Sequence, residues 1–298
     1  MPTPLQVAPP SLDPGRRLLL KREDAHELGA FKWRGALPAL RRYRERGADA
    51  VVTASTGNHG AATAWAAQRT GMRAVVFGPE GASRAKVGAI EDLGAELHLI
   101  GPDLDDAKER ARELAAERRL PFFEDGAEPT QFDGYGAIAD EIVEQLGESP
   151  AAVVVPVGNG ALLIGIARAL REGEPIGVVA KEAPVMALSV AAGRPVECDR
   201  CATIADGMAV RVAVPLAVAE LASLAVRMVE VSERSLARAI GAFHAAGIRV
   251  EASGAAALAA LERLDDLPVG PVVLIVSGRN IDEELHRRAV EEPDSFPD

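Results

Sequence analysis

Short apolar runs rich in Val and Ile alternate along the chain with longer Ala-rich segments of helical periodicity. The run "ADAVVTAS" is followed by "GAATAWAAQRT", "RAVVFG" by "SRAKVGAIEDLG", and "AAVVVPVG" by "ALLIGIARALRE". Apolar strands separated by helices are typical of parallel sheets that are covered by helices on both faces. The pattern therefore predicts an α/β fold.

The number of such units also fits a closed barrel, but two irregular segments interrupt the alternation. These are "EDGAEPTQFDGYG" and "VECDRCATIADGMAVRVAVP", and a barrel needs a regular repeat of strand and helix. We therefore expect two open parallel-sheet lobes, a large one from residues 1–52 and 133–298 and a smaller mobile one from residues 53–132. The Pro-rich start and the acidic end "EEPDSFPD" are expected to be frayed.

Composition narrows the class of partner. The chain has 298 residues, 48% of them hydrophobic and 26% charged, and a formal net charge of −11. An acidic chain lacks the Lys and Arg clusters that attract nucleic acid or anionic lipid, and no run approaches the roughly 20 apolar residues of a membrane span. We expect a cytoplasmic protein with a small-molecule partner and no nucleic-acid or membrane partner.

The two cysteines, Cys198 and Cys201, lie in "ECDRC". This spacing fits a redox pair or half of a zinc site, but no second pair exists and no His lies between His98 and His244. We expect two loop thiols.

Binding sites in open parallel sheets gather at the carboxyl ends of the strands. Two loops at such ends suit anions. In "PVGNGALL", residues 158–161 place small side chains at a helix start, where unpaired backbone N–H groups bind phosphate; a tight strand-to-helix turn is the alternative. The nucleotide-binding glycine patterns are missing, so the anion is not expected to belong to NAD or ATP.

In "TASTGNHG", four hydrogen-bonding side chains surround Gly57: Ser55, Thr56, Asn58 and His59. One Ser or Thr suffices to cap a helix. Four such side chains favour a seat for a substrate carboxylate.

Lys32 lies beside Phe31 in "GAFKWRGA", framed by Gly29 and Gly35. Taken alone, it is best interpreted as a surface lysine. A desolvated lysine beside small and aromatic residues could instead form a Schiff base.

These motifs occur together and in order, and the sequence resembles the fold-type II pyridoxal-phosphate enzymes, within them the serine/threonine dehydratase and serine racemase group. The resemblance covers nearly the whole chain and is carried by "LLLKRED", "GAFKWRGA", "ASTGNHG", "RAKVGAIEDLGAEL", "GYGAIADEI", "VPVGNGALL", "TIADGMAV", "VEASGAAALAAL" and "LIVSGRN". It implies a tryptophan synthase beta-like fold with pyridoxal 5'-phosphate in the interlobe cleft, and a homodimer.

The resemblance also implies roles for individual residues. Lys32 would hold the cofactor as an internal aldimine and take the α-proton, and Thr56 stands where the racemase has a serine that reprotonates the opposite face. Cofactor-binding roles fall on Phe31, Lys32, Asn58, Gly158, Asn159, Gly160, Ala161, Leu162 and Ser277. Substrate-binding roles fall on Ser55, Thr56, Asn58 and His59.

The implied reaction is elimination of the β-hydroxyl of L-threonine or L-serine, which gives a 2-oxo acid and ammonia. A hydroxyl partner such as Ser277 leaves the pyridine nitrogen largely unprotonated, which favours elimination over transamination. The alternatives are an amino acid racemase, a dehydratase of hydroxyaspartate or phenylserine, a threonine synthase-like replacement enzyme and a non-catalytic metabolite-binding protein.

Some positions depart from the family pattern. Val179 stands where many relatives have a metal-binding Glu, so no metal site of that type is expected, although Asp206 is present and Glu182 is nearby. Trp33 is expected to line the cleft or pack beneath the lysine, and Arg279 to lie near the cofactor or outside it. The "EPTQFDGYG" segment would close over substrate, and no regulatory domain is expected after "SGRN".

Overall fold

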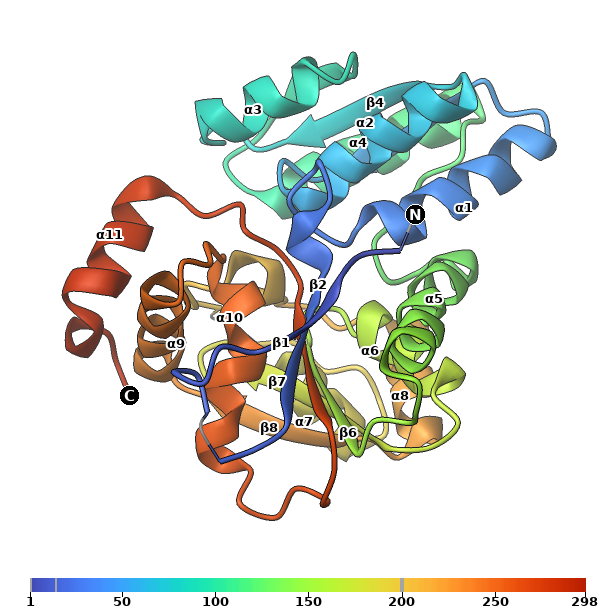
Figure 1. Ribbon diagram of the computed structural model, residues 1–298. Helices are drawn as coiled ribbons and strands as arrows, with labels where there is room; N and C mark the ends of the chain where they lie inside the picture. The colour runs from blue at the N-terminus through green and yellow to red at the C-terminus, as the bar shows by residue number, and fades with distance from the viewer. Residues whose placement is uncertain (1, 14, 199–200) are drawn as a thin grey trace. The chain divides into compact units, whose positions relative to one another are not determined.

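The computed structural model describes residues 2–13, 15–198 and 201–298, and the chain forms two compact units (Figure 1). Unit 1 comprises Met1–Phe31 and Tyr135–Asp298, and unit 2 comprises Lys32–Gly134. This division differs from the sequence-based one at residues 32–52 and 133–134, which belong to unit 2. The reason is non-local packing: strand β3 (Ala50–Ala54) pairs with β4 (Arg73–Gly78), and helix α1 (Trp33–Glu45) packs against α2 (Asn58–Thr70).

Unit 1 is built on a six-stranded sheet with the order β1-β2-β9-β6-β7-β8. Its strands are β1 (Leu5–Val7), β2 (Leu18–Arg22), β6 (Ala152–Pro156), β7 (Glu174–Ala180), β8 (Arg227–Val231) and β9 (Val272–Val276). All neighbours pair in parallel except β1, which adds an antiparallel edge. The predicted α/β class with parallel sheets is confirmed.

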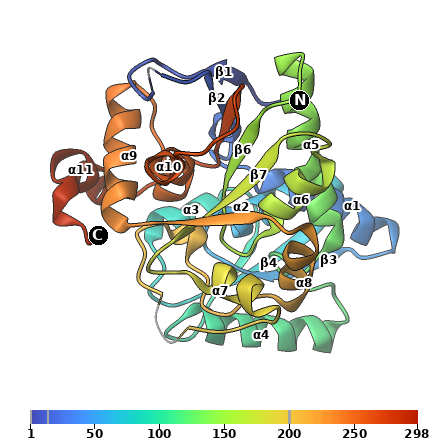
Figure 2. The same cartoon turned by 90° about the horizontal axis from the view of Figure 1, so that it is seen from below.

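Alternate residues of these strands face two layers of helices. Leu18, Leu20 and Val154 belong to one large apolar cluster with residues of α9 (Glu233–Ala245) and α10 (Ala252–Ala259), whereas the intervening Leu19 and Val153 do not. Because successive strand side chains point to opposite faces, α6 packs against β6 and β7 from the other side (Figure 2). This two-sided burial explains why the central strands are almost continuously apolar.

The helices of unit 1 begin at recognisable signals. Ser232 caps α9, Asp282 caps α11 by accepting two backbone N–H groups, and Pro215 opens α8. The helices are α6 (Ala161–Ala169), α7 (Val185–Ala192), α8 (Pro215–Leu224), α9 (Glu233–Ala245), α10 (Ala252–Ala259) and α11 (Glu283–Glu291). Among the helices of the described residues, none has the length and apolar character needed to cross a bilayer.

Unit 2 contains a three-stranded parallel sheet in the order β3-β4-β5, with β5 at Glu96–Leu99. Helix α4 (Leu104–Arg118), which Asp103 caps, places its buried alanines against Val52, Val75 and Phe77. Helix α2 packs on the same strands from the opposite face (Figure 2), and α3 (Arg84–Glu91) packs near β5. The unit is therefore a small three-layer sandwich.

Both chain ends are more ordered than the sequence suggested. Leu5–Val7 forms β1, and the buried Thr3 hydroxyl donates to Glu23 Oε1 at 2.5 Å. At the other end, Phe296 is only 3% exposed and packs in the main cluster of unit 1. The expectation of frayed ends was wrong, because Pro-rich composition does not reveal these individual buried anchors.

The segment expected to close over substrate begins a helix that has one buried face. Pro129–Leu146 forms α5, which carries the chain from unit 2 back into unit 1, and Phe132 and Tyr135 are almost fully buried. A Cβ at Gly134 would lie 2.1 Å from the Arg34 carbonyl oxygen. Gly134 serves close packing, and the segment is helical rather than a loop; its closure over substrate stays a prediction.

Candidate active site

The predicted site residues fall into two groups, one in each unit. In unit 1, the turn before the lysine is hydrogen-bonded to the "VSGRN" turn that follows β9. The Phe31 N–H donates to the Ser277 carbonyl at 3.1 Å, and the Arg279 N–H donates to the Gly29 carbonyl at 2.8 Å. The two motifs are nearly 250 residues apart in the chain, yet they form one structural element.

Gly29 is required in this turn for two reasons. Its φ of +67° lies in the left-handed region, and a Cβ there would lie 2.4 Å from Asn280 Oδ1. The Arg279 guanidinium donates to the Asp24 carbonyl at 2.5 Å, so Arg279 braces the backbone before the turn. Phe31 itself is half-buried and packs at 5.0 Å, centroid to centroid, from Tyr135.

Ser277 is 2% exposed and stands directly after β9. The turn that holds it is supported by Glu251, whose N–H donates to the Gly278 carbonyl at 3.1 Å and whose Oε2 accepts from the Asn280 N–H at 3.2 Å. A hydroxyl held by a rigid backbone at a strand end is suited to bind a ring nitrogen of fixed position.

The glycine loop between β6 and α6 has the form of an anion cradle. Gly160 has φ +91°, and the Ala161 N–H donates to Asn159 Oδ1 at 3.0 Å. A Cβ at Gly158 would lie 2.4 Å from the Gly207 carbonyl oxygen. The first-turn N–H groups of a helix lack intrahelical partners, so Gly158–Leu162 suit the phosphate of a cofactor.

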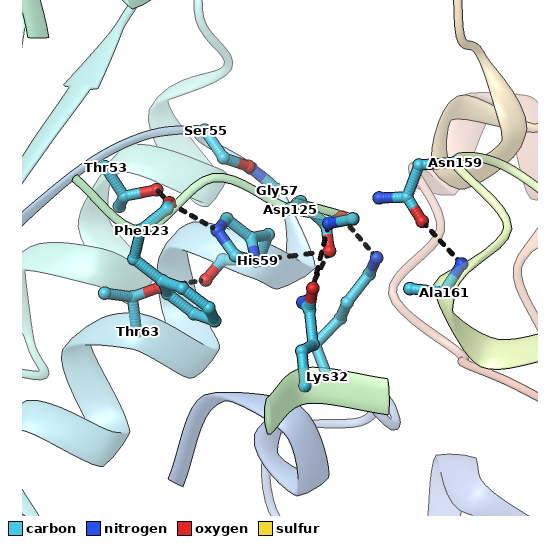
Figure 3. Close-up of polar contacts among 12 residues, drawn as sticks. Lys32, Thr53, Ser55, Gly57, His59, Thr63, Phe123, Asp125, Asn159 and Ala161 are labelled. Atoms are coloured by element: carbon cyan, nitrogen blue, oxygen red, sulfur yellow. Dashed lines mark hydrogen bonds and ion pairs between the residues drawn. The ribbon is translucent and has the colours of Figure 1, made fainter. Parts of the chain in front are cut away.

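In unit 2, Lys32 precedes the first residue of α1 and turns inward. Its ammonium forms an ion pair with Asp125 Oδ2, and the side chains of Lys32 and Asp125 are 12% and 24% exposed (Figure 3). The interpretation of Lys32 as an ordinary surface lysine does not describe this side chain.

His59 also faces Asp125, but its ring is fixed elsewhere. Its Nε2 lies 3.2 Å from the Phe123 carbonyl oxygen, so Nε2 carries the proton, and its Nδ1 is 3.6 Å from Asp125 Oδ1 (Figure 3). The ring is 5% exposed and packs against Phe123. Burial holds the pKa of the His59 imidazole below its ordinary value, against the opposing effect of Asp125. His59 is therefore a neutral support for the Phe123–Asp125 segment.

The burial of the His59 imidazole in its neutral form predicts that the stability of the protein depends on pH. The folded-state pKa of His59 lies below the unfolded value of about 6.5, so the unfolded chain binds more protons below that pH and stability falls as the pH falls. Between pH 7.5 and pH 5.5 the unfolding free energy of the wild type should fall. That of His59→Gln should fall less, by a difference of up to about 1.4 kcal/mol. Urea titrations at the two pH values measure this, and equal slopes would contradict it.

The "ASTGNHG" loop connects β3 to α2 without a side-chain cap. Gly57 is the N-cap residue and has no side-chain hydrogen bond to the helix, so the capping interpretation does not hold. The Ser55 N–H donates to the Phe77 carbonyl at 2.9 Å, and the Ser55 hydroxyl accepts from the Gly57 N–H at 3.2 Å. Ser55, Thr56 and Asn58 are half-buried, whereas His59 is buried.

The loop depends on the absence of a side chain at Gly60. A Cβ there would lie 1.9 Å from the Ser55 carbonyl oxygen, so Gly60→Ala should displace the loop and cost about 1–3 kcal/mol of unfolding free energy. The matched control is Gly88→Ala in α3, where nothing lies within 4 Å and a small gain is expected. Thermal melts of both variants test this, and equal melting temperatures would refute it.

Trp33 packs in unit 2. Its ring meets Trp65 of α2 edge-on at 5.9 Å between centroids, and the Arg69 guanidinium lies 3.8 Å from the Trp65 centroid. Trp33 therefore joins α1 to α2.

The sequence analysis missed Asp125, which the structure brings to Lys32. It also missed the two residues that surround this cluster, Phe123 and Gln131. They lie in or next to a segment interpreted as irregular. The parallel bridge between Phe122 and Val52 places this carboxylate where binding residues gather, but the bridge is visible only in the fold.

No metal centre is formed in the part of the chain that the structure describes, because no three His, Cys, Asp or Glu side chains come together there. Val179, at the family's metal position, is fully buried. Cys198 and Cys201 are free and half-buried, and the two residues between them lie outside the described residues.

Comparison with known proteins agrees with these features. A curated L-threonine ammonia-lyase from Geobacter sulfurreducens is 37% identical over 276 residues, which is 90% of this chain and 68% of that protein. An L-threonine dehydratase from Pasteurella multocida is 35% identical over 215 residues, which is 70% of this chain and 42% of that protein. The solved threonine deaminase isoform 2 of Solanum lycopersicum superposes with a TM-score of 0.91 and 32% identity, over 97% of this chain and 87% of that one.

The fold and the anion loop thus define an α/β enzyme of the fold-type II class. The family model described as pyridoxal-phosphate dependent enzyme matches residues 1–278. The chain belongs to this family, and its cofactor is pyridoxal 5'-phosphate.

Proposed function

We propose that this enzyme is an ammonia-lyase that eliminates the β-hydroxyl of L-threonine or L-serine, giving a 2-oxo acid and ammonia. The observation that carries the proposal is an inward-turned lysine directly after an anchored turn, in a chain whose similar proteins are named threonine ammonia-lyase, dehydratase and deaminase. The similarity extends over most of the chain.

Lys32 is proposed as the amine that attaches the cofactor and then carries the α-proton on Nζ. When bound, pyridoxal phosphate supplies an electron-accepting ring that stabilises negative charge at the α-carbon. The hydrogen bond from the Phe31 N–H to the Ser277 carbonyl limits where the Phe31 backbone can lie. The Cα of Lys32, the next residue, is restricted with it. Proton transfer at one carbon requires a proton acceptor held in a fixed position.

The cofactor-holding roles are proposed for unit 1 residues that fit the group. The Gly158–Leu162 backbone would hold the phosphate, Ser277 the ring nitrogen, and Phe31 the ring face. Ser277 supplies a hydroxyl there, which leaves the ring a weaker electron acceptor than a carboxylate would and favours prompt loss of a β-leaving group. Asn58 is proposed to bind the ring's 3-oxygen.

Ser55, Thr56 and Asn58 are proposed to bind the substrate carboxylate, since their half-buried side chains surround the start of α2. The first-turn N–H groups of a helix lack intrahelical partners, which favours an anion at this place. The sequence placed His59 among these substrate-binding residues. We propose that it instead fixes the position of the Phe123–Asp125 segment.

A substrate screen tests the proposal. Purified enzyme is incubated with L-threonine, L-serine, hydroxyaspartate, phenylserine and, as a control without a β-hydroxyl, L-alanine, and 2-oxo acid, ammonia and the inverted enantiomer are measured. We expect oxo acid and ammonia from L-threonine or L-serine and none from L-alanine. Inversion without ammonia would establish a racemase instead, and no product from any β-hydroxy amino acid would refute the proposed lyase.

The proposed assembly is a homodimer, on the basis of the family resemblance, and the proposed location is the cytoplasm, on the basis of the sequence pattern. Sedimentation of the purified enzyme and fractionation of the source cells test these two proposals.

A further inference from the structure

Asp125 is the centre of a polar cluster in unit 2 to which the proposed reaction assigns no role. One carboxylate oxygen, Oδ2, pairs with the Lys32 ammonium. The other, Oδ1, accepts from Gln131 Nε2 at 2.7 Å. It also lies 3.6 Å from His59 Nδ1 (Figure 3).

The carboxylate is oriented by Gln131, and the neutral His59 ring, whose Nδ1 has no proton to donate, only bounds its other side. Gln131 is fully buried, and its Oε1 accepts from the Gly126 N–H at 2.8 Å, so its amide is oriented. The His59 ring is fixed by the Phe123 carbonyl, to which the Thr53 hydroxyl also donates at 2.8 Å. A negative charge with its supports already formed is preorganised to receive a cation.

The Lys32 amine becomes such a cation whenever it has left the cofactor and carries a proton. At 12% exposure its ammonium is largely removed from water, and a partly buried charge is costly without a partner. We propose that Asp125 is a positioning residue that receives the Lys32 ammonium in this state and holds Nζ for the next proton transfer. No bond is made or broken at Asp125, and the proton stays on Nζ. This inference rests on Lys32 being the cofactor lysine.

The charge of Asp125 has a chemical consequence that does not depend on turnover. While Nζ is held in the ion pair with Asp125, the carboxylate shields it from acylating reagents. Asp125→Asn keeps the shape and the acceptor for Gln131 but removes the charge. The Lys32 amine should then react faster.

The test is acetylation of the full-length chain after removal of the cofactor, with modification of Lys32 followed by mass spectrometry of its peptide. Lys181, exposed in unit 1, is the internal reference. We expect Asp125→Asn to raise the Lys32 rate at least about fivefold, Asp125→Glu to return it to near wild type, and the exposed-site control Asp92→Asn to leave it unchanged.

The loaded enzyme gives a second readout. A misplaced Lys32 should lower kcat for L-threonine on the order of 10- to 100-fold in Asp125→Asn, with KM changed much less, because the residues proposed to bind the carboxylate are intact. A parallel loss in kcat and rise in KM in both Asp125→Asn and Asp125→Glu would indicate a purely structural role and overturn the inference.

An unchanged Lys32 acetylation rate in folded Asp125→Asn would also overturn it. If that variant lacks a cooperative melt, Asp125→Ala decides: it also removes the carboxylate, and its Lys32 rate must exceed wild type. Borohydride reduction of the wild-type holoenzyme separates the two proposals. A label on another lysine defeats the role of Lys32 itself, whereas a label on Lys32 with unchanged acetylation defeats only the role of Asp125.

Discussion

In the Lys32→Ala variant, the release of ammonia and 2-oxo acid from L-threonine should fall by on the order of 10³-fold or more. The variant loses the side chain that we propose both attaches the cofactor and acts as the base at Nζ, and no alanine side chain can replace either. The measurement is a coupled ammonia assay at saturating substrate and cofactor. Borohydride should fix the cofactor to the wild type on Lys32 and leave the variant unlabelled.

Lys86→Ala is the matched control. Lys86 lies on α3 and is half-buried, but it is not in any of the loops assigned to the cofactor, so its activity should stay within about twofold of wild type. A Lys32→Ala enzyme that retains ammonia release within about tenfold of wild type, or a borohydride label on Lys86, would remove the basis for assigning Lys32.

The α/β class could be predicted because the central strands are buried on both faces. The segments "AVVVP" and "VVLIV" are entirely buried, and only such a strand reads as an unbroken apolar run. β1 could not be predicted in this way, since its three residues are half-buried or exposed and its antiparallel pairing depends on where Leu19–Lys21 lies in the fold. The assignment of residues 32–52 to unit 2 likewise depends on the α1–α2 contact, which leaves no local signal.

The proposed site also contains some residues that the local sequence reveals and others that only the fold reveals. Lys32 and the two anion loops carry residue types that local chemistry makes conspicuous, such as a lysine beside glycines or small residues at a strand-to-helix junction. Asp125 has no such local setting, because its partners Lys32 and His59 are 93 and about 65 residues away in the chain. His59 shows the converse: its type suggested substrate binding, and its burial, visible only in the fold, suggests support.

A second cluster with a large expected effect lies in unit 1, around Lys21 of β2. This lysine is fully buried, and its ammonium donates to the Thr3 carbonyl at 2.7 Å and to Glu141 Oε2 of α5 at 2.5 Å. Glu141 Oε2 also accepts from the Thr3 N–H at 3.2 Å. The network ties the first residues of the chain to the sheet and to α5.

Replacing Lys21 with methionine should lower the free energy of unfolding by about 3–5 kcal/mol. Methionine fills much of the space of the lysine stem but leaves the Glu141 carboxylate, which is 15% exposed, without its buried cation. Since a folded domain is stable by only about 5–15 kcal/mol, the urea midpoint of unit 1 should shift strongly. The shift is measured by circular dichroism on cofactor-free protein, so that cofactor binding does not add to stability.

Arg17→Met provides the matched control, because Arg17 pairs with Glu148 at 2.5 Å in the same unit but both side chains are about half exposed. Water already solvates these charges, so the loss should not exceed about 1 kcal/mol. The double variant Lys21→Met with Glu141→Met should recover much of the single-variant loss, since the cost arises from the uncompensated charge and apolar side chains can replace a buried pair. A Lys21→Met midpoint no lower than that of Arg17→Met would show that the buried pair does not stabilise unit 1, and Thr3 would then be held by its hydrogen bonds alone.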